Sequence, residues 1–377
     1  MKETALYIHI PFCDHKCIYC DFYSIITSDN IQPYLIALKK EMTFYSKYYD
    51  NERIFTTVYF GGGTPSLMKP DYLGKIILQL KKNFNISENA EITMETNPGT
   101  VDKEKLKNFY DIGINRISIG IQSFQEDELN FLTRIHNKDV AIKTVYDAHD
   151  AGFDNINIDL IFNLPKQTKE KWLSNLETAV LLPVNHISAY SLILERGTIL
   201  NKIVLDGKLV MQDDDNDAEL YELTIDFLIS HGYIQYEVSN FAKEGFECMH
   251  NNAYWRYKDY LGLGTSSHSF VDGKRWWNYS SLKRYISSIE KKGNAEANHE
   301  FINAQQKLDE YVMLALRSKG LDINEFKNLF NDNWIDEKYN YFKQLTEENL
   351  AFFNESSICL TKKGYAVCDE ILSKLLA

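Results

Sequence analysis

The first 194 residues alternate between two hydrophobic patterns. Short runs rich in β-branched and aromatic residues predict strands, and longer segments with apolar residues three or four positions apart predict amphipathic helices. The predicted strands are 5–10, 56–60, 90–96, 116–122, 155–162 and 186–194, and the predicted helices are 31–49, 71–84, 102–113, 138–152 and 169–182. Six strands joined by five helical crossovers predict a parallel sheet. We expect an α/β fold, a partial (β/α)6 TIM-type barrel, with a doubly wound sheet as the alternative.

The rest of the chain shows weaker periodicity and then a second pattern. Between 195 and 300 the sequence predicts a helix near 216–231, a strand at 233–241 and an aromatic stretch at 250–264. Further on it predicts helices at 306–320, 322–330 and 335–350, a hairpin at 351–361 and a helix at 362–376. This order predicts a winged-helix-like α+β module. We therefore expect a barrel core at 1–195, a barrel extension at 196–300 and a C-terminal module at 301–377.

Charge and apolar content exclude several classes of protein. The formal net charge is −12, and residues 301–377 hold nine Lys or Arg against twelve Asp or Glu, whereas nucleic-acid-binding modules carry clustered basic residues. No apolar run reaches the ~18 residues that a membrane-spanning helix needs. The N-terminal apolar run lacks a small-residue cleavage site, so we interpret it as a strand and expect a cytoplasmic protein. The six cysteines then indicate metal binding or packing rather than disulfides.

Polar and glycine-rich residues stand at the carboxyl ends of the predicted strands. In a parallel barrel these ends meet at one mouth, where functional groups gather. Loops are often polar, so this alignment supports a site without proving one. The residues concerned are the cysteines at 13–20, the GGGTP sequence at 61–65, and Glu95, Asn97, Gln122, Ser123, Asp159 and Ser191.

Three cysteines, Cys13, Cys17 and Cys20, lie within eight residues, and Phe22 stands at the next alternate position. Closed zinc sites hold four ligands, usually as two separated pairs, and His15 is poorly spaced to join these thiols on one ion. Thiolates also hold iron–sulfur clusters. A [4Fe–4S] cluster on three thiolates leaves one iron open, as reactive sites do. The spacing favours this cluster, with zinc and unligated thiols as alternatives.

The C-x3-C-x2-C spacing, with Tyr19 before the last cysteine, resembles the radical S-adenosylmethionine (SAM) superfamily. In that superfamily the amino and carboxylate groups of SAM chelate the open iron, so the resemblance implies SAM and a [4Fe–4S] cluster as cofactors. The sequences YIHIPFC, CIYCDFY, YFGGGTPS, ETNPGT, RISIGIQSF and GFDNINIDLIFNLP resemble, more narrowly, the oxygen-independent coproporphyrinogen oxidase family. This similarity covers nearly the whole chain.

The family resemblance implies site residues but assigns no catalytic side chain. Cys13, Cys17 and Cys20 would hold the cluster. Residues at family positions around the first SAM are Tyr7, Tyr19, Gly62, Gly63, Thr64 and Glu95, and those at positions that contact a second SAM in the oxidase are Gln122, Arg134 and Asp159. Leu192 aligns loosely with a position that supplies a backbone contact. Without the resemblance, Glu95 and Asp159 have a simpler interpretation as caps at strand ends.

Two features differ from the oxidase. The oxidase has a further cysteine at the position of Phe22. In lacking this cysteine, the sequence resembles the haem-chaperone branch of the same family. The sequence HNNAYW at 250–255 resembles the H-N-x-x-Y-W motif associated with haem binding in that branch. His250 offers an imidazole to iron, and Tyr254 and Trp255 offer aromatic faces to a porphyrin. Chemistry alone favours a packing role for such a histidine; Cys248 and His268 are further candidate ligands.

Three hypotheses follow. In the first, the chain is a haem chaperone that binds haem, delivers it to haem proteins, respiratory ones among them, and carries a SAM-liganded [4Fe–4S] cluster. In the second, it is an oxygen-independent coproporphyrinogen III oxidase that converts two propionates to vinyl groups. In the third, it is a zinc-stabilised winged-helix regulator. The sequence leaves open whether SAM is cleaved, whether the chain is an enzyme, and whether it is a monomer or a dimer.

Overall fold

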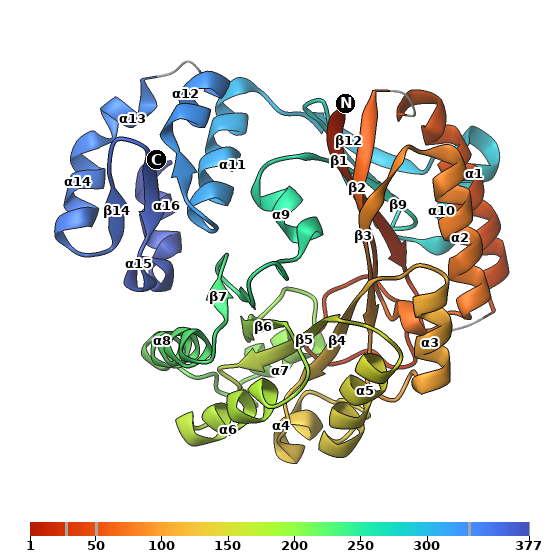
Figure 1. Cartoon of the computed structure of the whole chain (residues 1–377), viewed down its shortest axis with the longest axis horizontal. Coiled ribbons are helices and arrows are strands. Elements are labelled where there is room, and N and C mark those ends of the chain that lie inside the picture. Colours follow the sequence, from red (N-terminus) through yellow and green to blue (C-terminus); the bar gives the residue numbers. More distant parts are fainter. Residues whose placement is uncertain (27–28, 50–51, 331–332, 377) are drawn as a thin grey trace.

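The computed structural model describes residues 1–26, 29–49, 52–330 and 333–376. Figure 1 shows a strongly curved sheet with helices along its outer side and a group of short helices at the C-terminal end. Hydrophobic runs buried on both faces form the centre of this sheet, as expected for parallel strands. The strands at its centre are β1 (Lys2–Ile10), β2 (Arg53–Gly62), β3 (Ile86–Thr96), β4 (Arg116–Gln122), β5 (Asn155–Phe162) and β6 (His186–Ser191).

The strand order decides between the two predicted architectures. The strands are hydrogen-bonded in the order of the sequence, from β1 to β6, and every pair is parallel. A doubly wound sheet reverses its strand order at a switch point, so that alternative is wrong and the partial (β/α)6 barrel is confirmed. In the described residues β1 pairs on its other side with β9 (Asp259–Leu263), and β6 with β8 (Asn240–Ala242), so the barrel does not close.

The helices between the strands follow the predicted apolar periodicity. Several begin at a side-chain cap, as where the Asp102 carboxylate accepts a hydrogen bond from Lys105 N at 2.8 Å. In the described ranges, no helix has both the length and the apolar character needed to cross a bilayer. The crossover helices are α1 (Ile31–Tyr49), α2 (Pro70–Asn83), α3 (Lys103–Asp111), α5 (Lys138–Asp150) and α6 (Lys169–Val180). The short α4 (Glu126–Phe131) and α7 (Ile199–Leu205) were not predicted, because these segments are too short to show a helical period.

The structure differs most from the sequence prediction between residues 233 and 301. The strand predicted at 233–241 is a hairpin of β7 (Ile234–Gln235) and β8, because the Glu237 carboxylate accepts a hydrogen bond from Ser239 N and turns the chain. The helix predicted near 216–231 is α8 (Asp214–Ser230). Beyond β9, three unpredicted antiparallel strands extend the sheet, β10 (His268–Val271), β11 (Lys274–Asn278) and β12 (Glu296–Phe301); α10 (Leu282–Lys292) precedes the last of them.

A buried carboxylate fastens this extension to the barrel. Glu41 of α1 is fully buried and accepts hydrogen bonds from Gly264 N at 2.8 Å, Tyr285 Oη at 2.7 Å and Asn278 Nδ2 at 2.6 Å. Burial raises the pKa of this carboxyl to about 7. One side chain therefore ties the first crossover helix to residues more than 200 positions further along the chain.

The C-terminal residues form a second hydrophobic core around a small sheet. The core runs from Leu308 to Leu375, separate from the barrel core. The helices predicted at 335–350 and 362–376 are each two helices, the latter broken at Val367 (φ −116°). The elements are α11 (Ala304–Leu316), β13 (Leu321–Asp322), α12 (Ile323–Phe330), α13 (Trp334–Glu337), α14 (Tyr339–Glu347), β14 (Ala351–Phe353), β15 (Ser357–Leu360), α15 (Lys362–Ala366) and α16 (Cys368–Leu375). The winged-helix assignment and the three-part division of the chain stay predictions.

Candidate cofactor site

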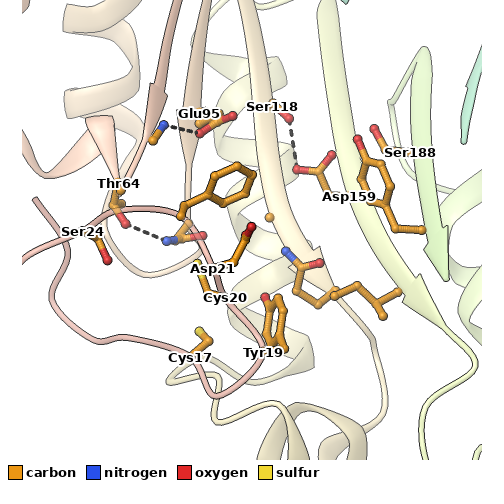
Figure 2. A pocket seen from close by; sticks show the side chains of 18 of the residues that line it. Cys17, Tyr19, Cys20, Asp21, Ser24, Thr64, Glu95, Ser118, Asp159 and Ser188 are labelled. Atoms are coloured by element: carbon orange, nitrogen blue, oxygen red, sulfur yellow. Dashed lines mark hydrogen bonds between the residues drawn. The ribbon is translucent and has the colours of Figure 1, made fainter. Parts of the chain in front are cut away.

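The carboxyl ends of the six parallel strands surround one cavity of about 450 Å³. Figure 2 shows the cysteine loop on one side of it and side chains from the strand ends on the other. The cavity is lined by the predicted residues Cys13, Cys17, Tyr19, Cys20, Gly62, Gly63, Thr64, Glu95, Gln122, Arg134 and Asp159, and also by Asn97, Ser191 and Leu192. Parallel pairing thus brings together residues from nearly the whole predicted barrel core.

The loop that carries the cysteines is tied to the strand ends. Cys13 N donates to Ile25 O at 3.0 Å, and Ile25 N donates to Pro11 O at 2.7 Å, so the loop closes beside the end of β1. The Cys13 thiol and the Thr64 hydroxyl lie 3.2 Å apart. Burial raises the pKa of the Cys20 thiol to about 11, so its thiolate needs a nearby cation or metal.

The glycine turn after β2 is held by Glu95, at the end of β3. The two carboxylate oxygens accept hydrogen bonds from Gly62 N at 3.1 Å and from Tyr59 Oη at 2.9 Å. Gly62 has a φ of +113°, which favours glycine, and a Cβ on Gly63 would lie 2.6 Å from Phe12 O. Burial raises the pKa of the Glu95 carboxyl to about 7. Because Gly62 and Gly63 have no side chains, the backbone of this turn faces the cavity beside the thiols.

Arg134 carries positive charge to the thiols. Its Nη1 lies 3.6 Å from Cys17 Sγ, and its Nη2 donates to Asn97 Oδ1 at 2.7 Å and to Gly120 O at 2.5 Å. The neighbouring Gln122 has a φ of +74°, an unfavourable backbone conformation for a residue with a side chain. Such strain often marks functional sites.

Asp159 belongs to a polar network below the cavity mouth. Its carboxylate accepts hydrogen bonds from Ser118 Oγ at 3.1 Å and Asn157 Nδ2 at 2.8 Å. Asn157 Oδ1 in turn lies 2.5 Å from His186 Nδ1. Burial raises the pKa of Asp159, and the hydrogen bonds from Ser188, Asn157 and Ser118 oppose that shift. These hydrogen bonds fix the orientation of the Asp159 carboxylate.

Among the residues that the sequence did not indicate are His9, which supports the cysteine loop, and Asn251, the second residue of the HNNAYW segment. His9 is buried, and its Nε2 lies 2.9 Å from Tyr23 O in the cysteine loop while its Nδ1 lies 3.1 Å from Tyr7 Oη. Asn251 lines the cavity. The alternation of β1 indicates only that its side chains alternate between faces, so nothing in the sequence marks His9 as a support of the loop.

The HNNAYW segment is half-buried for most of its length, and its histidine is buried inside the barrel. It forms α9 (Met249–Trp255), which Figure 1 shows on the concave side of the sheet. His250 is 2% exposed, its Nδ1 lies 2.8 Å from Thr57 Oγ1, and its Nε2 lies 3.0 Å from Tyr254 Oη. Burial lowers the pKa of His250 to about 3. Both ring nitrogens are thus engaged, and iron ligation would require one of these contacts to break.

The other predicted haem residues do not form one surface. Cys248 is fully buried, and burial raises the pKa of its thiol to about 12. His268 is exposed and stacks on Trp277 with ring centroids 5.9 Å apart, whereas Trp255 is half-buried on α9. Tyr7 lies behind the cavity wall, 6.1 Å from the ring of Tyr59. Apart from Tyr7, the predicted cluster and SAM residues therefore line one cavity, and the haem candidates do not.

The thiols suit an iron–sulfur cluster better than a single metal ion. Among the described residues, no three His, Cys, Asp or Glu side chains lie close enough to share one ion. In a [4Fe–4S] cluster each thiolate binds a different iron, so the ligands stand apart around the cluster. The three thiols are half-buried and face one cavity. That donor set fits the cluster, and the single-ion zinc alternative is not supported.

The fold and the thiol-bearing cavity define a radical SAM protein, since the family model described as "Radical SAM superfamily" matches residues 7–179. The solved structure of coproporphyrinogen III oxidase (HemN) from Escherichia coli superimposes with a TM-score of 0.84 at 23% identity, and covers 99% of this chain and 90% of its own. At that identity the likeness shows the fold alone.

Proteins of similar sequence show which family within this superfamily the chain belongs to. Heme chaperone HemW of Bacillus subtilis is 33% identical over 376 residues, which cover 99% of both chains. Heme chaperone HemW of Escherichia coli is 37% identical over 73% of this chain and 72% of its own. The "Radical S-adenosyl methionine domain-containing protein 1, mitochondrial" of Danio rerio is 34% identical over 99% of this chain and 87% of its own. The chain belongs to the HemW family within the radical SAM superfamily.

Proposed function

We propose that this chain is a haem chaperone that carries a SAM-liganded [4Fe–4S] cluster. The observation that carries the proposal is the full-length similarity to proteins named heme chaperone HemW, which covers 99% of this chain and 99% of the Bacillus subtilis relative. Phe22 supports it: the side chain at the position of the extra oxidase cysteine is 62% exposed and lines the cavity.

The residues around the cavity have distinct proposed roles. Cys13, Cys17 and Cys20 hold the cluster, and SAM, when bound, supplies amino and carboxylate ligands to the open iron. Glu95 orients the Gly62 turn through the Gly62 N–H, and Arg134 places a cation beside Cys17. The remaining proposed SAM contacts are Tyr19, Gly63, Thr64, Gln122 and Asp159. Tyr7, which does not line the cavity, would act by supporting the ring of Tyr59.

Haem is the proposed cargo, and haem proteins, respiratory ones among them, are the proposed recipients. His250, Tyr254 and Trp255 stay the candidate haem residues, with the condition that α9 must rearrange before the His250 imidazole reaches iron. We also propose a cytoplasmic location. All six cysteines are free in the described chain, as expected in a reducing compartment.

The test compares cargo transfer with oxidase turnover. Anaerobically reconstituted protein receives reductant, SAM and coproporphyrinogen III, and protoporphyrinogen and 5′-deoxyadenosine are measured together. In parallel, haem-loaded protein is mixed with an apo-form respiratory cytochrome, and transfer is followed by absorbance, with Cys17→Ala protein as the control. We expect haem transfer and no porphyrin product. Protoporphyrinogen formed over many turnovers would establish the oxidase instead and make Phe22 a neutral difference.

A further inference from the structure

The helix that carries the HNNAYW segment is fastened to the barrel interior by β3. Glu91 of β3 accepts hydrogen bonds from Met249 N at 3.0 Å and from His250 N at 3.1 Å, the first two amides of α9. Arg116 Nε lies 3.9 Å from the same carboxylate. Glu91 and Glu95 lie on one strand with their side chains on one face, since they are four residues apart. The strand that holds α9 therefore also carries the residue that orients the glycine turn.

His250 contacts the cofactor site most closely through the ring of Tyr59, and it lies farther from Tyr7, at 6.3 Å between ring centroids. Its imidazole stacks on Tyr59 with ring centroids 4.8 Å apart and an interplanar angle of 27°. Thr57 Oγ1 and Tyr254 Oη lie at hydrogen-bonding distance from the two ring nitrogens, so the imidazole cannot rotate away from Tyr59 without losing a contact. Tyr59 Oη donates to Glu95 Oε1 at 2.9 Å, and Gly62 N donates to the other oxygen at 3.1 Å.

We propose that His250 is a positioning residue for SAM: its imidazole holds Tyr59, and Tyr59 holds Glu95 and the Gly62 turn in the geometry that binds SAM. This inference rests on the proposed SAM binding and not on haem binding. It gives the buried histidine of the HNNAYW segment a role in the structure as it stands, with α9 in place. An aromatic stack contributes about 0.5–1.5 kcal/mol, so its loss should weaken SAM binding roughly two- to tenfold.

The same imidazole cannot do both tasks at once. If His250 ligates haem iron, it leaves Thr57 or Tyr254 and its stack on Tyr59 loses support. Because linkage is reciprocal, haem bound at His250 and SAM would then weaken each other by the same factor. A haem ligand elsewhere in the chain would leave SAM binding unchanged. The affinity for SAM would thus depend on whether α9 holds His250 against Tyr59.

The experiment measures SAM affinity of anaerobically reconstituted full-length protein by calorimetry. The variants are His250→Ala, Tyr59→Phe and the double variant, and the control is Met249→Leu, which changes an exposed side chain of the same helix. We expect weaker SAM binding in both single variants, a double variant that is less than additive, and unchanged binding in the control. Iron content and thermal melting check that each variant is folded and loaded.

A fallback variant covers the case in which His250→Ala does not fold. Thr57→Val removes the hydrogen bond to His250 Nδ1 with little change of shape, and we expect it to weaken SAM binding in the same direction. Unchanged SAM affinity in folded His250→Ala, or in Thr57→Val if the alanine variant is unfolded, would overturn the proposal. A haem titration of the same samples keeps the two proposals apart: lost haem binding with intact SAM affinity contradicts only the positioning role.

Discussion

The imidazole of His9 lies so close beneath Gly62 that a Cβ on Gly62 would be 2.5 Å from His9 Cε1. The same ring lies 2.9 Å from Tyr23 O in the cysteine loop. The glycine turn and the cysteine loop, which are about 40 residues apart in sequence, are therefore packed against the two sides of one buried side chain. This arrangement explains why the thiols and the bare turn face the same cavity.

Gly62→Ala should disrupt the site through this contact. Gly62 and Gly245 both have a left-handed backbone, with φ of +113° and +83°, but nothing lies within 4 Å of a Cβ on Gly245. Gly245→Ala is therefore a matched control for backbone strain. We expect Gly62→Ala to lose most of its reconstituted iron and SAM binding and Gly245→Ala to keep both, measured as iron and sulfide per chain and by SAM titration. Equal loss in the two variants would show that strain, not contact with His9, is responsible.

Each of the three loop cysteines should be needed for the cluster. Cys13→Ala, Cys17→Ala and Cys20→Ala each remove one thiolate from the cavity, whereas Cys359→Ala changes a thiol in the C-terminal module, whose Sγ donates to Lys319 O. We expect iron and sulfide to fall to a small fraction in the three loop variants only. Full cluster content in any one of them would exclude that cysteine as a ligand.

Arg134→Lys should weaken the site although it preserves the charge. A lysine ammonium cannot reproduce the planar fork that reaches Asn97 and Gly120 O with one nitrogen and Cys17 with the other. We expect SAM affinity to fall about tenfold, the ~1.4 kcal/mol of one good hydrogen bond. The exposed Arg256→Lys is the control. Identical SAM affinities in the unchanged protein, Arg134→Lys and Arg256→Lys would mean that only the charge at position 134 matters.

Glu41→Gln should change how stability depends on pH. The folded protein holds this carboxyl at a pKa of about 7, against an ordinary value of 4.5. The folded state thus binds the proton more tightly, and Glu41 makes folding less favourable as pH rises from 4.5 to 7, by about 3 kcal/mol in total. We expect the variant to lack this decline in the free energy of unfolding, measured by urea denaturation across that range. The profile of exposed Glu88→Gln should match the unchanged protein; a Glu41→Gln profile that also matches would show that Glu41 does not titrate there.

The sequence by itself determined the barrel and, through the family resemblance, the three thiols and several of the other cavity residues. Apolar periodicity reports which face of a strand or helix is buried, so β1 to β6 and their crossovers were predicted within a few residues, and parallel topology then placed Glu95, Gln122 and Asp159 at one mouth. The spacing of Cys13, Cys17 and Cys20 is a local property of one loop and needed no tertiary information.

Only the tertiary structure decided features that depend on contacts between distant segments. The pairing of β9 with β1 joins residues about 255 positions apart, and no local pattern specifies that partner. Chemistry alone favours packing for His250 and the family resemblance favours haem, and only the contacts with Thr57 and Tyr59 placed the imidazole inside the barrel. Whether a polar side chain is buried depends on which strands surround it, and those strands come from elsewhere in the chain.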